Sequence, residues 1–219
     1  LQHQDGHSPV LASTVPSVRT YDPAFSWELA ILVRYGIQRM FIEDHDELFY
    51  LMMYNEAVPM PPRPAHADLD EGVIRGGYLL EPASGKGRRV NLLGSGTILF
   101  EVMEAASRLR ADGYAVAVYS ITSYVELARD AERAEQSTLS GHVEAAWLNE
   151  LFSESGVPTV AATDYVRALP RMIASWLPEP FVALGTDGFG MSERREDLRA
   201  HFKVDAESIA EVARKLAAH

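Results

Sequence analysis

The chain has 219 residues, enough for one large domain or two small ones, and its content of 47% hydrophobic and 23% charged residues excludes collagen, coiled coils and disorder. A formal net charge of -11 removes the electrostatic basis for binding nucleic acid or an anionic membrane, and no apolar run approaches the ~18 residues of a membrane span. The chain has no cysteine, which excludes disulfides, thiolate metal sites and a cysteine nucleophile and suits a cytoplasmic protein.

The first segment, Leu1–Ser8, is a polar loop that carries His3 and His7. Its histidines and carboxylate suit proton transfer and the binding of a polar substrate, although a solvated terminal loop has the same composition. Spacing by four residues would place two metal ligands on one helix face, but Gly6 and Pro9 favour a loop. Because the chain opens without a methionine within such a loop, we expect it to be a piece of a longer protein.

Between this loop and residue 58 the sequence predicts one helix, over residues 23–40, and one buried strand, over residues 48–54. The acidic run Glu43–Glu47 could hold a hard cation, but consecutive carboxylates cannot all face one ion, so a solvated connection is favoured. One helix and one strand do not make a domain. We therefore interpret residues 1–58 as the end of a domain.

The segment Pro59–Pro64 marks a boundary, because it holds four prolines in six residues and must be extended. We predict a stiff linker over residues 59–75 and a separate domain over residues 76–219.

Strands and helices alternate in this second region. The apolar runs predict strands over residues 90–93, 115–120, 159–163 and 181–185. Helical patterns fall over residues 97–111, 124–134, 143–152, a stretch ending before Trp176, 193–202 and 206–217. This alternation predicts an α/β fold with a mostly parallel sheet and helices on both faces.

Two glycine-rich turns follow predicted strands. Gly94-Ser95-Gly96 could aim backbone N–H groups at a phosphate, but Leu99 stands where a dinucleotide fingerprint has its third glycine, so a tight strand-to-helix turn is favoured. The turn Thr186–Ser192 could bind a ligand at the carboxyl end of a strand, or could be an ordinary turn with Ser192 as the N-cap of the next helix.

Several segments stand in the order of one known family and cover nearly the whole chain: Leu1–Ser8, Tyr21–Pro23, Gly94–Gly96, Ser120–Ser123, Glu126–Asp130, Leu184–Ser192, His201–Phe202 and Val204–Ala206. By these segments the chain resembles the homodimeric first component of bacterial pyruvate dehydrogenase complexes, a thiamine-diphosphate-dependent family of the transketolase superfamily. The resemblance implies that residues 1–58 end a pyrimidine-binding α/β domain and that residues 76–219 form a transketolase-like C-terminal domain.

The resemblance also implies an activity: decarboxylation of pyruvate with thiamine diphosphate and Mg²⁺, followed by reductive acetylation of a lipoyl group on the acyltransferase core. His3 is the expected catalytic residue, with His7 nearby, whereas the diphosphate motif, the metal ligands and the activating Glu would precede residue 1. This piece would be mainly structural, would support the homodimer together with the N-terminal domains, and would be inactive and bind no cofactor alone. A free-standing binding or dimerisation module of the same family, and another transketolase-type enzyme, are the alternatives.

Overall fold

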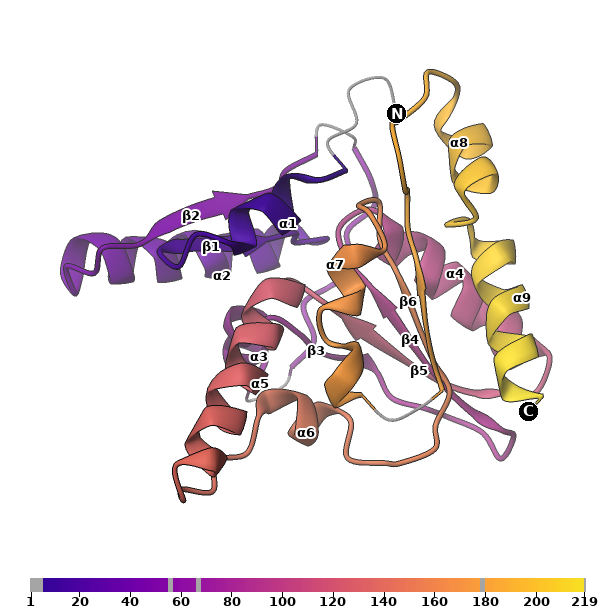
Figure 1. Cartoon of the computed structure of the whole chain (residues 1–219). Coiled ribbons are helices and arrows are strands. Elements are labelled where there is room, and N and C mark those ends of the chain that lie inside the picture. Colours follow the sequence, from indigo (N-terminus) through magenta and orange to yellow (C-terminus); the bar gives the residue numbers. More distant parts are fainter. Residues whose placement is uncertain (1–5, 55–56, 66–67, 178–179, 219) are drawn as a thin grey trace.

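The computed structural model of the chain describes residues 6–54, 57–65, 68–177 and 180–218. It has two parts (Figure 1): an elongated arm built from residues 6–54, and a larger part organised around a five-stranded sheet. Among the described residues, no helix is both long enough and apolar enough to cross a membrane.

The arm is a β-α-β unit preceded by the short helix α1 (Ser8–Ser13). Strand β1 (Val18–Tyr21) pairs in parallel with β2 (Leu48–Leu51), and α2 (Ser26–Ile37) connects them, continuing as the π-helical turn η1 (Gln38–Ile42). The predicted helix over residues 23–40 is therefore present. Strand β1 was missed, because Arg19 and Thr20 interrupt the apolar run by which strands are recognised.

Strand β2 is not the buried strand that the sequence predicted. Its side chains alternate between exposed and half-buried, and Leu48 is 63% exposed. The Phe49 ring lies against Gly36 of α2 and stacks on Tyr21, with ring centroids 6.0 Å apart. Helix α1 packs against β1 of this two-stranded sheet, whereas Leu48 and Tyr50 of β2 remain exposed, so an apolar run alone gave the wrong burial.

The large sheet has the strand order β3-β5-β4-β6-β7. Four strands are parallel: β4 (Arg89–Gly94), β5 (Ala115–Ser120), β6 (Thr159–Ala162) and β7 (Phe181–Leu184). The edge strand β3 (Tyr78–Glu81) is antiparallel to β5 and was not predicted. The predicted class, an α/β fold with a mostly parallel sheet, is confirmed.

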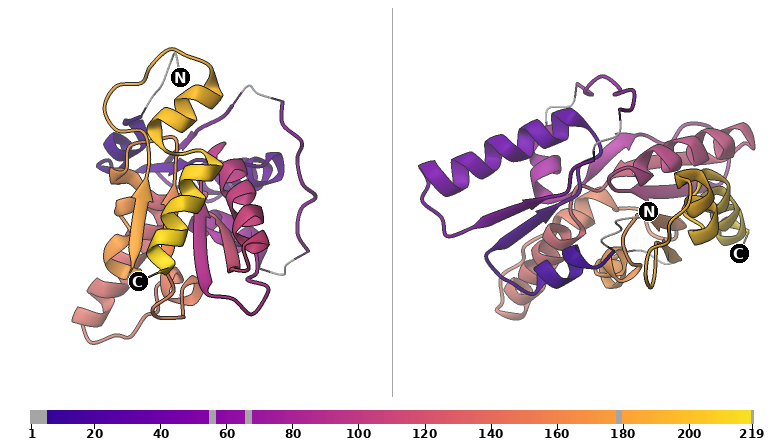
Figure 2. Two further views of the ribbon diagram at one scale, coloured as in Figure 1. Left: turned by 90° about the vertical axis from the view of Figure 1, so that its right-hand side faces the viewer. Right: turned by 90° about the horizontal axis from the view of Figure 1, so that it is seen from above.

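Helices cover both faces of this sheet (Figures 1 and 2). On one face lie α4 (Ile98–Ala111) and α9 (Ala206–Ala217), whose apolar stripes are buried against β4, β5 and β6. On the other face lie α5 (Tyr124–Leu139), α6 (Trp147–Leu151) and α7 (Ala168–Arg171), the last followed by the 3-10 turn η2 (Ala174–Trp176). Gly113 follows the C-terminal end of α4 and has a left-handed φ of 92°.

Two further details differ from the sequence predictions. The segment assigned to the linker contains α3 (Leu69–Arg75), which buries Leu69 and Val73 beside Tyr21 of the arm. Helix α8 (Arg195–Phe202) has Arg194 and not Ser192 as its N-cap. Asp205 does occupy the N-cap position of α9, but its side chain makes no capping hydrogen bond.

Candidate functional site

Polar residues gather where the two sheets meet. Asp22 directly follows β1, Ser95 and Gly96 follow β4, and Thr163 follows β6, so all of them stand at carboxyl ends of parallel strands. Two backbone hydrogen bonds join the segments: the Asp22 N–H donates to the Thr122 carbonyl oxygen (2.7 Å), and the Gly96 N–H donates to the Asp22 carbonyl oxygen (3.1 Å). In open α/β sheets this end of the strands is where ligands bind.

The Asp22 carboxyl is the centre of this cluster. The side chain is only 4% exposed, and its Oδ1 accepts a hydrogen bond from the Tyr54 hydroxyl. Burial raises the pKa of Asp22 to about 7. Near neutral pH this group can therefore hold or release a proton.

Gly96 makes room for this pair. A Cβ at Gly96 would lie 2.1 Å from the Tyr54 hydroxyl and 2.4 Å from Asp22 Oδ1, and the residue has a left-handed φ of 49°. The favoured interpretation of Gly94–Gly96, a tight strand-to-helix turn, therefore has a second reason. A buried carboxyl in contact with the turn also makes it a poor site for a phosphate.

A second carboxyl lies at the same end of the sheet. The Thr97 hydroxyl donates to Asp164 Oδ2 (3.0 Å), and the Ser95 and Thr163 hydroxyls are 3.1 Å apart. Burial raises the pKa of Asp164. Asp22, Tyr54, Thr163 and Asp164 were not identified as functional candidates from the sequence, where the only signal is a polar residue directly after each short strand.

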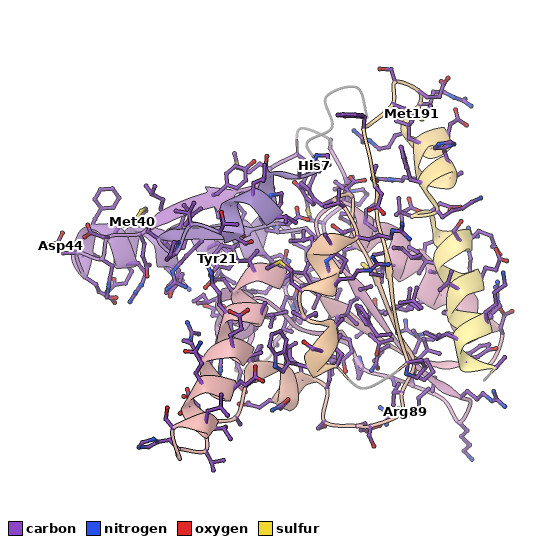
Figure 3. The ribbon with its side chains drawn as sticks, in the orientation of Figure 1. His7, Tyr21, Met40, Asp44, Arg89 and Met191 are labelled. Atoms are coloured by element: carbon purple, nitrogen blue, oxygen red, sulfur yellow. The ribbon has the colours of Figure 1, made fainter. Side chains whose placement is uncertain are left out.

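The end of the histidine loop lies beside this cluster. The Gly6 carbonyl oxygen accepts a hydrogen bond from the Val166 N–H (3.0 Å), which ties the loop to the segment after β6. His7 is exposed and is the N-cap of α1 (Figure 3). His3, the expected catalytic residue, lies outside the described residues, so its distance from the Asp22 carboxyl is not part of this structure.

The turn over residues 186–192 is fixed by its own contacts. The Thr186 N–H donates to the Tyr165 carbonyl oxygen (2.9 Å), and the Asp187 carboxylate accepts from the Arg167 N–H (2.9 Å) and from its guanidinium (2.6 Å). Phe189 is 93% exposed. An ordinary turn accounts for these contacts, and Asp187 already has a cationic partner.

The acidic segment over residues 43–47 is far from this site. Asp44 lies at the tip of the arm, away from His7 (Figure 3). Glu47 pairs with Arg19 (2.8 Å) and with Arg39 (2.7 Å), which hold its pKa at about 2. In the described parts of the chain no three His, Asp or Glu side chains are grouped so that they could hold a metal ion. The carboxylates of the acidic segment therefore do not fit a Mg²⁺-diphosphate site.

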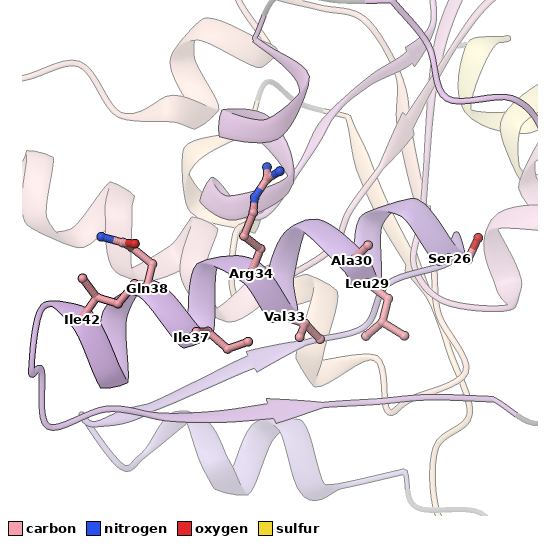
Figure 4. A pocket seen from close by; sticks show the side chains of 8 residues that line it. All are labelled: Ser26, Leu29, Ala30, Val33, Arg34, Ile37, Gln38 and Ile42. Carbon is pink, nitrogen blue, oxygen red and sulfur yellow. The ribbon is translucent and has the colours of Figure 1, made fainter.

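One exposed apolar surface lies on the arm, which we call the α2 face. In Figure 4 the side chains of Leu29, Val33 and Ile37 point to the same side of α2. Val33 is 43% exposed, Ile37 is 49% exposed, and Ile42 of η1 is 68% exposed. Neighbouring apolar side chains with this much exposure are typical of a surface that meets another protein.

Two family models match the chain in sequence order. Residues 1–61 match the pyruvate dehydrogenase E1 component middle domain, and residues 76–205 match the transketolase-like C-terminal domain. The chain is similar to the pyruvate dehydrogenase E1 component of Corynebacterium glutamicum (41% identity, 95% of this chain, 23% of the relative) and to that of Escherichia coli K12 (39%, 97% and 24%). It spans about a quarter of the length of these curated relatives.

Solved structures share the fold. Transketolase from Leishmania mexicana matches with a TM-score of 0.69 at 17% identity over 99% of this chain and 28% of that one. A structure described as "Split gene transketolase, inactive beta4 tetramer" matches with a TM-score of 0.69 at 17% identity over 99% of this chain and 63% of that one. At such low identity these matches establish the fold alone.

Proposed function

Because the chain belongs to the transketolase-like family and matches the middle and C-terminal domains of pyruvate dehydrogenase E1 components, we propose that it forms this part of such an enzyme. The whole enzyme decarboxylates pyruvate with thiamine diphosphate and Mg²⁺ and then reductively acetylates the lipoyl group of an acyltransferase core, in the cytoplasm. The observation that carries the proposal is the match of both domain models in family order.

Within this enzyme, residues 1–58 form the end of the pyrimidine-binding domain, and residues 76–219 form the C-terminal domain. Residues 59–75 are the linker between these two domains. This part is mainly structural, supports a homodimer and needs the N-terminal domains for activity. The support for that division of labour is that the chain matches models of the middle and C-terminal domains and spans about a quarter of the length of the curated relatives.

His3 is the proposed catalytic residue. An imidazole beside the substrate can stabilise its carboxylate or carbonyl and move a proton as the reaction proceeds. Support comes from the end of its loop: the Gly6 carbonyl is anchored to Val166, beside Thr163 and Asp164, at the end of the sheet where ligands bind in this type of fold. His7 follows in the same loop.

We expect His3→Ala in the longer enzyme to slow acetylation of lipoyl groups by about 10²–10⁴-fold, the usual contribution of one positioned proton-transfer group. Cofactor binding, measured by calorimetry, should not change. His142→Ala is the matched control, because His142 is exposed and lies beyond the end of α5. An unchanged acetylation rate would remove His3 from the mechanism, and turnover by the 219-residue chain alone would refute the domain assignment.

The alternative is a free-standing binding or dimerisation module, and the α2 face is the surface through which such a module would act. Under both proposals this face is covered by protein, so the isolated chain should self-associate or bind a hydrophobic dye. Ile37→Glu should weaken association measured by light scattering, whereas Leu139→Glu, at an 84% exposed position outside the face, should not. A monomeric parent chain without a dye signal would count against a covered α2 face.

A further inference from the structure

A small cavity, not fully enclosed, lies between the arm and the first turn of α5. Its volume, counted as the space that the centre of a water molecule can occupy, is about 10 Å³. Its walls come from the end of β1, the turn after β4 and the segment that leads into α5, and all of the lining residues are buried. A space of this size admits one water molecule but not two.

Three lining side chains have a buried polar atom without a hydrogen-bond partner among the described residues. These atoms are Thr20 Oγ1, Asp22 Oδ2 and the Tyr124 hydroxyl oxygen. The three residues are only 2%, 4% and 2% exposed. Nearly all buried polar groups in folded proteins have a partner, so three such atoms around one cavity need an explanation.

Two neighbouring hydroxyl groups already donate to backbone carbonyl oxygens, and the Ser95 hydroxyl, which also lines the cavity and lies close to Asp22, pairs with the Thr163 hydroxyl (3.1 Å). The Ser123 hydroxyl donates to the Thr20 carbonyl oxygen (2.6 Å), and the Thr122 hydroxyl donates to the Val73 carbonyl oxygen (2.7 Å). Asp22 Oδ1 accepts from the Tyr54 hydroxyl, which leaves Oδ2 as the oxygen to be satisfied.

The chemistry of the cavity favours water over a metal ion. Ca²⁺ takes six to eight oxygen ligands and Mg²⁺ demands an octahedral set, whereas only three side-chain oxygens lack a partner here. A buried water molecule typically makes about three hydrogen bonds, and both hydroxyl groups can act as donor or acceptor. One water molecule can therefore satisfy all three atoms.

We propose that this cavity binds a single water molecule, which hydrogen bonds to Asp22 Oδ2, Thr20 Oγ1 and the Tyr124 hydroxyl and so joins the arm to α5. The water donates to Asp22 Oδ2 and to one hydroxyl, and it accepts from the other hydroxyl. If Asp22 is protonated, its O–H donates to the same water. The water molecule thus gives Asp22 Oδ2 a hydrogen-bond partner in both the ionised and the protonated form of the carboxyl.

Substitution of the hydroxyls tests the proposal by the sign of its effect. Removing a hydroxyl that binds a water lowers stability, whereas removing an unpaired hydroxyl from a dry cavity raises it. We expect Tyr124→Phe and Thr20→Val each to lower the thermal midpoint of the full chain by about 2–4 °C. Tyr114→Phe is the control, since Tyr114 is half-buried and its hydroxyl has no partner among the described residues. An unchanged or raised midpoint for both variants would overturn the proposal.

A crystal structure of the unsubstituted chain tests the site directly and does not depend on the folding of a variant. We expect one density peak at about 2.7–3.2 Å from the three oxygen atoms, without an anomalous signal after a soak in rubidium chloride. The absence of a peak, or a peak that rubidium replaces, would each overturn the assignment of a water molecule.

Discussion

The arm and the five-stranded part both consist of parallel strands connected by helices, but they bury their sheets to different extents. In the large part, helices cover both faces of the sheet, and Leu92 and Leu93 on opposite faces of β4 are both fully buried. In the arm, α2 packs against the two strands and α1 contacts β1, but Leu48 of β2 stays 63% exposed. A β-α-β unit therefore supplies the topology of a parallel sheet, but only a second layer supplies a core.

Polar contacts hold the arm to the rest of the molecule. The Glu28 carboxylate of α2 is fully buried and accepts hydrogen bonds from the hydroxyls of Tyr78 (2.7 Å) and Ser120 (2.6 Å) on the large sheet. Arg19 of β1 pairs with Glu126 of α5 (2.5 Å), and Arg129 donates to the Val18 carbonyl oxygen (2.8 Å). The arm is thus attached by hydrogen bonds and ion pairs as well as by apolar contact.

The largest expected effect comes from the same substitution made in both sheets. Leu92→Ala, at a fully buried position, should lower the free energy of unfolding by about 2–5 kcal/mol, through lost burial and a cavity. Leu48→Ala, at a 63% exposed position of β2, should change it by less than about 0.5 kcal/mol. Urea denaturation of both variants measures this difference. Equal losses would mean that the open face of the arm is covered in solution.

Alanine substitutions at Gly96 and Gly113 distinguish the destabilisation caused by backbone strain from that caused by crowding at the junction of the two parts. Gly96 and Gly113 both have positive φ, but a Cβ at Gly113 meets nothing within 4 Å, whereas one at Gly96 meets Tyr54 and Asp22. We expect Gly113→Ala to cost about 1–2 kcal/mol from strain alone. Gly96→Ala should cost about 2–4 kcal/mol, because overpacking is added. Equal midpoints in thermal unfolding would show that the Tyr54–Asp22 pair moves aside freely.

A further effect appears only when pH is varied. Burial raises the pKa of Asp22 to about 7, above the ~3.9 of an unfolded aspartate, so its contribution to stability is fully present below about pH 4 and is lost as pH rises toward 7. Across this window the slope it adds approaches about 1.4 kcal/mol per pH unit. Asp22→Asn should remove that slope in urea titrations.

Asp112→Asn is the matched control for this titration, because Asp112 forms an exposed pair with Arg214 (2.9 Å). Its stability profile should follow that of the parent chain. A parent profile that stays flat from pH 4 to 7 would contradict the raised pKa and would make Asp22 an ordinary surface-like carboxylate.

The sequence by itself determined the class of the large part. Strand β5 was predicted with its observed bounds, and the stripe of Ile98, Val102, Ala105 and Leu109 is fully buried on α4. Such long elements have one or two covered faces, so burial imposes a hydrophobic period that can be read in one dimension. The segments that carry the family resemblance are also short stretches of sequence, so they could be recognised without the tertiary structure.

The tertiary structure alone decided the short elements and the site. Strands β1 and β3 each contain a charged residue and so lack the uninterrupted run by which the equally short β6 and β7 were predicted, and they are stabilised by partners elsewhere in the chain. Asp22 meets Tyr54 and Gly96 only because the arm's strand ends beside β4. Periodicity records how much of an element is covered, but it does not record which polar side chains from different elements meet, since chain topology fixes that proximity.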